Sequence, residues 1–396
     1  MDSYDVIVLG GGMAGVSIGY ELAADRRVLL LEMEATLAFH TTGRSAAMFL
    51  ESYGGPAIRA LTTASRAFLT APAEVAPDLT PTAPLLSPLP MLHIARPGYG
   101  EAIRVLHREV SALVPDVTLL GPEAAARVQP LLRAEHVELA VLEPGAMEID
   151  VHGLHQLFLA GLRRRGGQVL ASAPVVSARH DGMWVVRDPA GRTWRAPVVV
   201  DAAGAWADQV GQLFGAGGIG LRVLRRTAFM VDAPPGARAP MIADIDDAFY
   251  VKPDAGKLLC SPADEAVQEP GDARPDELEI ARAIDVINEV TTLDVKHVRS
   301  AWAGLRNFVA DRTPVVGYDP AVEGFFWFAA QGGYGIQTAP AMARTGAALL
   351  RGDPIPADVA ARGLLAQSLA PDRSALPVSD HHRDHAPERR PRPLRA

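Results

Sequence analysis

The stretch Tyr4-Asp5-Val6-Ile7-Val8-Leu9-Gly10-Gly11-Gly12-Met13-Ala14-Gly15 decides the fold of this 396-residue chain. Its first six residues are mainly apolar and β-branched, which predicts a short buried parallel strand. The pattern Gly-x-Gly-x-x-Gly follows, and Val16 to Ala24 has a helix-forming composition. Arg27 to Glu32 predicts a second buried strand. The segment therefore predicts a βαβ unit with a right-handed crossover.

This glycine pattern, with its flanking elements, predicts a dinucleotide site. Gly10 permits a tight turn, Gly12 lets a pyrophosphate approach the backbone, and Gly15 lets helix and sheet pack closely. The helix N-terminus then faces the phosphates. Glu32 lies 22 residues beyond Gly10, where a carboxylate accepts the ribose hydroxyls and disfavours the 2′-phosphate of NADP. The pattern alone leaves FAD and NAD open.

Composition narrows the class of protein. Lys and Arg number 38 against 46 Asp and Glu, a net charge of −8, which argues against a nucleic-acid partner. The single cysteine, Cys260, excludes an intramolecular disulfide and a cysteine-rich zinc site, and no metal is predicted. Because no apolar run reaches about 18 residues, no membrane span is expected. The N-terminus lacks the basic region of a signal peptide, so we expect a cytoplasmic location.

The rest of the chain alternates between helix and strand patterns. Helices are expected at 101–113, 151–165, 277–290 and about 335–350, and strands at 168–170, 183–186, 196–201 and 325–330, with antiparallel strands between 223 and 262. Residues 371–396 are rich in Pro, Arg and His, which predicts a disordered tail. Within it, His381, His382 and His385 are interpreted as solvated rather than metal-binding.

Three further segments have the composition of cofactor contacts. The first, residues 40–47, is a polar loop of small residues that can hydrogen-bond a diphosphate, followed by an expected helical start. The second, Val199 to Trp206, is a strand that ends in small residues. The third, residues 331–338, joins a strand to a helix, and its backbone N–H groups can face a flavin pyrimidine edge.

These stretches resemble the FAD-dependent D-amino-acid oxidase superfamily and, within it, the bacterial FAD-dependent D-arginine dehydrogenase family. The resemblance runs from about Tyr4 to Pro371. It rests on residues 40–47, 225–229, 249–256, 302–306 and 325–338. It implies an α/β (α+β) fold: a glutathione-reductase-like FAD-binding Rossmann domain with a smaller antiparallel-sheet substrate domain. The first would comprise 1–78, 145–222 and 304–370, and the second 79–144 and 223–303. FAD would be non-covalent, since Cys260 does not fall where covalent relatives attach flavin.

The resemblance also implies the site residues. The FAD contacts would be Gly10, Gly12, Ala14, Gly15, Glu32, Met33, Thr41, Thr42, Gly43, Arg44, Ser45, Ala46, Ala47, Met48, one of Val175 and Val176, Gly204, Gly332, Gly333, Tyr334, Gly335, Ile336 and Gln337. Arg226 and Arg306 would hold the substrate carboxylate, Tyr53 and Tyr250 would close over it, and Met48, Met91 and Gly333 would complete the site. Independently of the resemblance, a planar guanidinium suits a carboxylate through two parallel hydrogen bonds.

The sequence departs from the arginine-specific relatives at three positions. Met91 stands where they carry a glutamate that receives the distal guanidinium, and no Asp or Glu occurs between Asp78 and Glu101. Met48 replaces a histidine, and Leu50 replaces a hydroxyl-bearing residue. A cationic side chain buried there would lose hydration without an opposing charge, whereas an apolar one gains about 25 cal/mol per Å². We therefore expect a D-amino acid with an apolar or neutral side chain.

The expected reaction is oxidative deamination to a 2-oxo acid and ammonia, with hydride transfer from Cα to flavin N5. The sequence does not identify a general base, and the electron acceptor, quinone-type or oxygen, stays open. One alternative is an oxidase or dehydrogenase of secondary amines such as N-methyl amino acids, glycine or imino acids. Others are a non-catalytic FAD-binding subunit, which the paired arginines disfavour, and an NAD-dependent enzyme.

Overall fold

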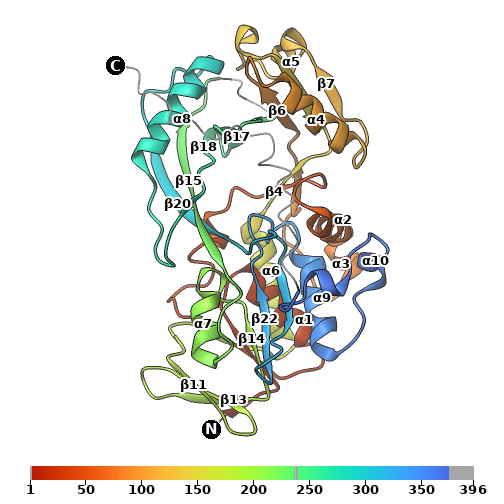
Figure 1. Cartoon of the computed structure of the whole chain (residues 1–396), viewed down its shortest axis with the longest axis vertical. Helices are drawn as coiled ribbons and strands as arrows, with labels where there is room; N and C mark the ends of the chain where they lie inside the picture. Colours follow the sequence, from red (N-terminus) through yellow and green to blue (C-terminus); the bar gives the residue numbers. More distant parts are fainter. Residues whose placement is uncertain (1, 236, 238–239, 374–396) are drawn as a thin grey trace.

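The computed structural model describes residues 2–235, 237 and 240–373 (Figure 1). Its first sheet has six strands, five of them parallel, and contains the predicted βαβ unit. In spatial order they are β10 (Gln168–Leu170), β3 (Val28–Leu31), β2 (Val6–Leu9), β14 (Val198–Asp201), β22 (Phe325–Ala329) and the antiparallel β21 (Val315–Tyr318). This sheet carries the glycine-rich turn at the carboxyl end of β2.

Both faces of the six-stranded sheet are covered, because alternate residues of each strand point in opposite directions. On β2, Val6 and Val8 pack with α1 (Met13–Leu22), α6 (Val151–Arg164) and α9 (Ala339–Arg351). Ile7 and Leu9 pack on the other face, against α7 (Ala207–Phe214) and a four-stranded sheet. That sheet consists of β1 (Asp2–Ser3), β13 (Thr193–Ala196), β12 (Trp184–Arg187) and β11 (Ser177–His180).

The largest sheet has nine strands and forms the upper half of the molecule in Figure 1. Its order is β19 (Ala266–Val267), β15 (Arg222–Asp232), β18 (Lys257–Ser261), β17 (Tyr250–Asp254), β16 (Met241–Asp244), β6 (Met91–Ala95), β8 (Leu139–Glu143) and β7 (Thr118–Leu120), with β20 (Ser300–Phe308) paired to β15. The pairing is antiparallel as expected, except between β16 and β6, which run parallel. The helices α4 (Gly100–Ser111), α5 (Pro122–Val128) and α8 (Glu277–Val290) pack on it.

Further elements lie outside these three sheets. They are the sheet of β4 (Met48–Phe49), β9 (Met147–Ile149) and β5 (Leu86–Pro88), and the helices α2 (Pro56–Thr70), α3 (Pro72–Val75) and α10 (Ala357–Ala360). Two expectations are corrected here. Strand β4 follows residues 40–47, and the next α-helix begins only at Pro56, where a proline suits the first helical turn. Helix α9 begins at Ala339 rather than at 335.

The ordered chain continues slightly beyond the predicted start of the tail at Pro371. Arg373 is held by Asp311 through two hydrogen bonds of 2.8 and 3.0 Å, and both side chains are nearly buried. Residues 374–396, which include His381, His382 and His385, lie outside the described residues. The division into an FAD domain and a substrate domain at the predicted boundaries stays a prediction. In the described part of the chain, no helix is long and apolar enough to cross a membrane.

Candidate active site

A cavity of about 1540 Å³ extends between the six-stranded and nine-stranded sheets. It is lined by most of the residues that the sequence singled out. They are Gly10, Gly12, Ala14, Glu32, Met33, Thr41, Thr42, Arg44, Ser45, Ala46, Ala47, Met48, Tyr53, Met91, Val175, Gly204, Arg226, Tyr250, Arg306, Gly332, Gly333, Tyr334, Gly335, Ile336 and Gln337. Segments far apart in the sequence thus converge on one space.

Three predicted cofactor contacts do not line the cavity. A Cβ on Gly15 would lie 1.9 Å from the Gly10 carbonyl oxygen, and one on Gly43 would lie 2.4 Å from the Ala38 carbonyl oxygen. Both glycines therefore permit close backbone packing, which for Gly15 is the packing role expected of it. Val176 is 51% exposed and does not line the cavity, so Val175 is the member of the pair that lies at the cavity.

The β2–α1 turn is held by side chains from elsewhere in the chain. The Gly11 N–H donates to Glu32 Oε2 at 2.6 Å, and the Glu34 N–H donates to Glu32 Oε1 at 2.8 Å. The Met13 N–H, in the first turn of α1, donates to Thr42 Oγ1 at 3.0 Å. Glu32 is thus a buried carboxylate that orders the turn, and each of its oxygens keeps acceptor capacity for a ligand hydroxyl.

The loop of residues 38–47 is tied to the nine-stranded sheet. Thr41 Oγ1 donates to the Leu305 carbonyl of β20 at 2.7 Å. Arg44 Nη1 donates to the carbonyls of Ala273 and Ala303, and its Nη2 pairs with Asp272 at 2.6 Å. The Arg44 guanidinium is therefore engaged by protein groups, although the residue lines the cavity.

Four buried polar atoms on the cavity wall have no hydrogen-bond partner among the described residues. They are His40 Nδ1, Arg226 Nε, Asn307 Oδ1 and Gln331 Nε2. Buried polar groups are ordinarily paired, so this wall suits a ligand with both donors and acceptors, as the isoalloxazine and ribityl groups of FAD are. The sequence indicates cofactor segments around His40 and Gln331, but no pattern in it marks either of these residues, or Asn307, as a contact.

Strand register places the two predicted carboxylate-binding arginines on one face. Arg226 of β15 lies opposite Gly304 of β20, and Arg306 is two residues further along β20. Since side chains alternate along a strand, Arg226 and Arg306 face the same side, toward the cavity. Their side chains are 13% and 19% exposed. Burial and the positive charge of Arg306 lower the pKa of Arg226.

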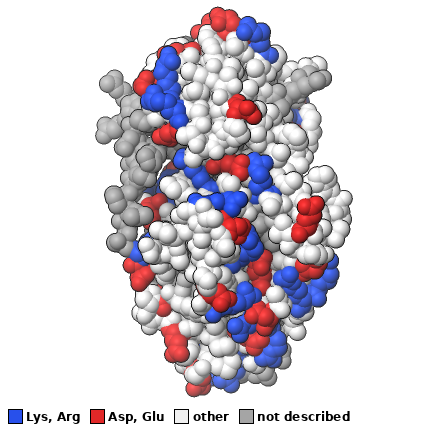
Figure 2. All heavy atoms as spheres, turned by 90° about the vertical axis from the view of Figure 1, so that its right-hand side faces the viewer, with Lys and Arg blue, Asp and Glu red and all other residues white. Residues whose placement is uncertain are grey.

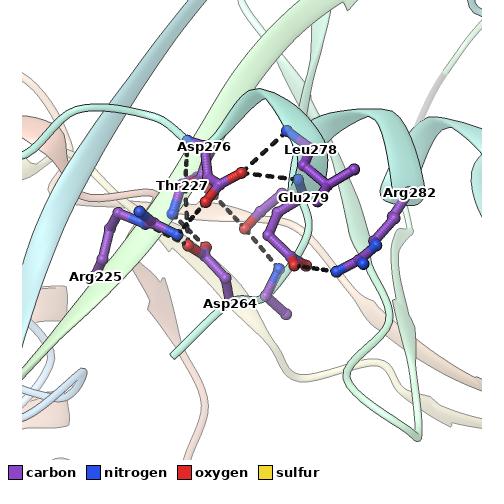
Figure 3. Close-up of polar contacts among 9 residues, drawn as sticks. Arg225, Thr227, Asp264, Asp276, Leu278, Glu279 and Arg282 are labelled. Carbon is purple, nitrogen blue, oxygen red and sulfur yellow. Dashed lines mark hydrogen bonds and ion pairs between the residues drawn. The ribbon is translucent and has the colours of Figure 1, made fainter. Parts of the chain in front are cut away.

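The neighbouring Arg225 takes the opposite face and belongs to a separate network (Figure 3). Its guanidinium pairs with Asp264 at 2.9 Å and with Asp276 at 2.8 Å. Asp264 also accepts from the N–H and Oγ1 of Thr227, and Asp276 caps the first turn of α8. The alternation therefore places adjacent arginines on opposite faces of β15, Arg225 in an acidic network and Arg226 beside Arg306.

Two charged residues that the sequence analysis missed lie beside the arginine pair. Glu265 Oε1 accepts from Arg226 Nη2 at 3.2 Å and lies 3.9 Å from Arg306 Nη1. Arg312 donates to both oxygens of Glu265, at 2.9 and 3.3 Å. Burial raises the pKa of Glu265, but the hydrogen bond from Arg312 and the three nearby positive charges outweigh it and hold the pKa below its usual range. Both residues follow strand ends, where no periodicity indicates direction.

Another wall of the cavity is apolar and contains the predicted methionine. Met91 belongs to a buried cluster with Leu50, Leu89, Ala146 and Met241, against which Met48, Tyr53, Ala243 and Tyr250 pack. One acid lies next to it: Glu143 of β8 is directly opposite Met91. Glu143 accepts from Ser52 Oγ at 2.7 Å and is only 2% exposed, and burial raises its pKa. It is absent from the lining of the cavity.

The tyrosines border the arginine pair. Tyr53 and Tyr334 lie with ring centroids 5.0 Å apart. Burial, together with Tyr53, raises the pKa of Tyr334 to about 12, so its hydroxyl stays protonated at neutral pH. Gly333 packs on Arg306, because a Cβ there would lie 3.0 Å from the guanidinium carbon. A side chain at 333 would therefore displace Arg306.

The distribution of charge can be followed on one face of the molecule. On the face shown in Figure 2, basic and acidic side chains are interspersed rather than gathered by sign. Among the residues that the structure describes, no group of three or more His, Cys, Asp and Glu side chains is placed to hold a metal ion.

Comparison with known proteins defines the class. The profile of the FAD dependent oxidoreductase family matches residues 5–349, so the chain belongs to that family, and it binds FAD. Glycine oxidase of Geobacillus kaustophilus is 25% identical, over 85% of this chain and 90% of its own. The crystal structure of that enzyme superposes with a TM-score of 0.79 over 92% of this chain and 99% of its own, at 22% identity, which supports the fold.

A second relative matches a smaller part of this chain. Human mitochondrial dimethylglycine dehydrogenase is 26% identical over 66% of this chain but only 30% of its own length. These comparisons support the broad resemblance to the D-amino-acid oxidase superfamily. The narrower resemblance to D-arginine dehydrogenases stays a prediction.

Proposed function

We propose that the protein oxidises the amine of a small substrate that carries a carboxylate, and that secondary or N-substituted amino acids and glycine are the preferred class. The observation that carries this proposal is the pair Arg226 and Arg306 on one face of a cavity shared with the FAD segments. Two relatives are named for the oxidation of glycine and dimethylglycine. FAD, when bound, accepts the electrons released from the carbon next to the nitrogen.

The protein's own groups supply orientation and desolvation. A guanidinium fork fixes the carboxylate plane and, through it, the adjacent carbon. Tyr53 and Tyr250 cover the site beside Arg306. Because the amine must be neutral to assist oxidation, the positive charge of the arginine pair favours the reacting form by lowering the amine pKa. The cluster around Met91 receives an apolar group on the nitrogen.

A second candidate is a D-amino acid with an apolar or neutral side chain. The same apolar cluster favours it, because the wall around Met48 and Met91 receives a side chain as well as an N-alkyl group. D-Arginine is disfavoured, since its guanidinium would be buried against thioethers, and Glu143, the acid opposite Met91, does not line the cavity. We also propose that FAD is held non-covalently and that a quinone-type acceptor or oxygen reoxidises it. A cytoplasmic location stays a prediction from the sequence.

The test is anaerobic mixing of the yellow holoprotein with single amines while the flavin absorbance near 450 nm is followed. The panel contains glycine, N-methylglycine, N,N-dimethylglycine, L-proline and the D- and L-forms of leucine, methionine, phenylalanine and arginine. Bleaching by N-methylglycine or glycine faster than by any D-amino acid supports the proposal. Faster bleaching by D-leucine or D-methionine favours the second candidate, and no bleaching by any amine contradicts both.

A further inference from the structure

Four charged side chains meet at the carboxylate end of the cavity. The carboxylate of Glu265 faces the guanidinium groups of Arg226, Arg306 and Arg312. All four residues line the cavity, and the Glu265 side chain is 27% exposed. Three positive charges are therefore balanced by one negative charge within the cluster, and Asp247 is a further acid whose charge acts on Arg226.

The backbone that carries Glu265 is fixed by the network of Figure 3. Its neighbour Asp264 is 3% exposed and is held by Arg225 and by two hydrogen bonds from Thr227. Ala263 adopts a left-handed conformation, φ +50°, in the turn that leads from β18 to this point. Asp264 thus faces the network, while Glu265 projects into the cavity.

The contacts of Glu265 are unequal. Arg312 forms a bidentate pair with both carboxylate oxygens, the stronger geometry. Arg226 reaches only one oxygen, at 3.2 Å, and its Nε is buried with no partner among the described residues. The donors of Arg226 are therefore incompletely satisfied by Glu265, and a carboxylate that binds in the cavity would complete them.

We propose that Glu265 is an internal anion that occupies part of the carboxylate position on Arg226, and that it sets the selectivity of the site for zwitterions over simple carboxylates. This inference deepens the proposed function and rests on it. An incoming carboxylate displaces Glu265 Oε1 from Arg226, and Glu265 stays on Arg312. A simple carboxylate is repelled by the displaced charge, whereas a ligand that also carries a cationic nitrogen offsets that repulsion.

The test uses two ligands that cannot be turned over through a nitrogen lone pair. Acetate is the simple carboxylate, and N,N,N-trimethylglycine is the zwitterion. Each is titrated into the FAD-loaded protein, and its Kd is obtained from the perturbation of the flavin spectrum. The variants are Glu265→Gln and Arg312→Gln. Glu101→Gln, which removes the same charge from the exposed surface of α4, is the matched control.

The two cavity variants are expected to move acetate affinity in opposite directions. Glu265→Gln removes the competing anion and should lower the Kd of acetate about tenfold. The Kd of trimethylglycine should fall by a clearly smaller factor. In Arg312→Gln, Glu265 can pair only with Arg226 and Arg306, so it competes more strongly with acetate. The Kd of acetate should rise by a similar factor. Glu101→Gln should change neither Kd. A merely structural pair would instead give losses of affinity in both variants.

Three outcomes would overturn the inference. In Glu265→Gln, these are an acetate Kd that is unchanged or higher, and Kd values for acetate and trimethylglycine that fall by the same factor. In Arg312→Gln, it is an acetate Kd that falls. If Glu265→Gln fails to fold, Glu265→Asp replaces it, because the shorter side chain withdraws the charge from Arg226 and should tighten acetate by a smaller factor. The titrations require no turnover, so opposite shifts without bleaching by any amine would contradict the proposed function and leave the anion assignment standing.

Discussion

The two ends of the cavity are built in different ways. At the nucleotide end, the glycine-rich turn, helix α1 and Glu32 come from one run of about thirty residues, and the constraints are steric ones on the backbone. At the substrate end, Met91, Arg226, Glu265 and Arg306 come from separate strands and loops. There the constraints are charge and strand register, which no single stretch of sequence contains.

This difference implies different responses to substitution. A change at the nucleotide end should act on cofactor binding and folding together, because the turn has no spare space. A change at the substrate end should alter affinity and selectivity while FAD stays bound. Three predictions test this contrast, from the largest expected effect to the smallest, and a fourth concerns the pH dependence of stability.

Gly15→Ala should abolish FAD binding. The added Cβ would lie 1.9 Å from the Gly10 carbonyl oxygen, and a backbone atom cannot move aside as a flexible side chain can, so destabilisation of about 3 kcal/mol is expected. The measurements are the ratio of flavin to protein absorbance after purification and the melting temperature. Gly121→Ala is the control, since nothing lies within 4 Å of a Cβ there. A yellow Gly15→Ala protein of normal stability would refute the steric argument.

Arg306→Met should lower kcat/KM for the best amine by about 10²- to 10³-fold with FAD retained, because a charge-assisted bidentate contact is lost. Arg306→Lys, which keeps the charge but not the planar fork, should recover only part of the loss. Steady-state kinetics and flavin content provide the comparison. Loss of flavin in Arg306→Met would show that the two ends are not separable.

The sequence could predict one end of the cavity far better than the other. The βαβ unit, Glu32 and the small-residue loops follow from local pattern, and Arg226 and Arg306 came from the resemblance. Glu265 and Arg312 were missed because each follows the end of a strand and their proximity depends on how the chain folds around β15 and β20. Glu143 could not be predicted for a related reason: it is distant from Met91 in the sequence and lies beside it only through the pairing of β6 with β8.

Met91→Ala should reduce kcat/KM for amines with an apolar substituent by about tenfold relative to glycine, since a methylene-sized contact in an apolar pocket has that effect. Leu92→Ala is the matched control. It is adjacent on β6 but packs into the core on the opposite face, so it should reduce stability without changing the ratio. An unchanged ratio in Met91→Ala would remove the apolar wall from the specificity argument.

The last prediction concerns the pH dependence of stability and involves Asp201, at the carboxyl end of β14. Burial raises its pKa from 3.8 to about 8. Between these values the folded protein keeps a proton that the unfolded chain has released. The free energy of unfolding therefore falls as pH rises, by up to about 1.4 kcal/mol per pH unit, and this contribution is fully present only below pH 3.8.

Asp201→Asn should flatten that part of the stability profile and should make the protein more stable than the wild type at pH 8. The free energy of unfolding is measured by urea titration at intervals between pH 4 and pH 9. Substitution of the exposed Asp116 by asparagine is the control for the loss of one carboxyl group. Parallel profiles for wild type and Asp201→Asn would contradict the assignment.

The hydrogen bonds of Arg44 have a consequence for how the protein matures. This side chain holds the 38–47 loop against the backbone of β20 and against residues 272 and 273. We therefore expect the loop and β20, the strand that carries Arg306, to become ordered together. Opening of the 38–47 loop would then be expected to loosen β20 as well. Protease susceptibility of the 38–47 loop and deuterium uptake along β20 should decline together as FAD is added, with the same midpoint.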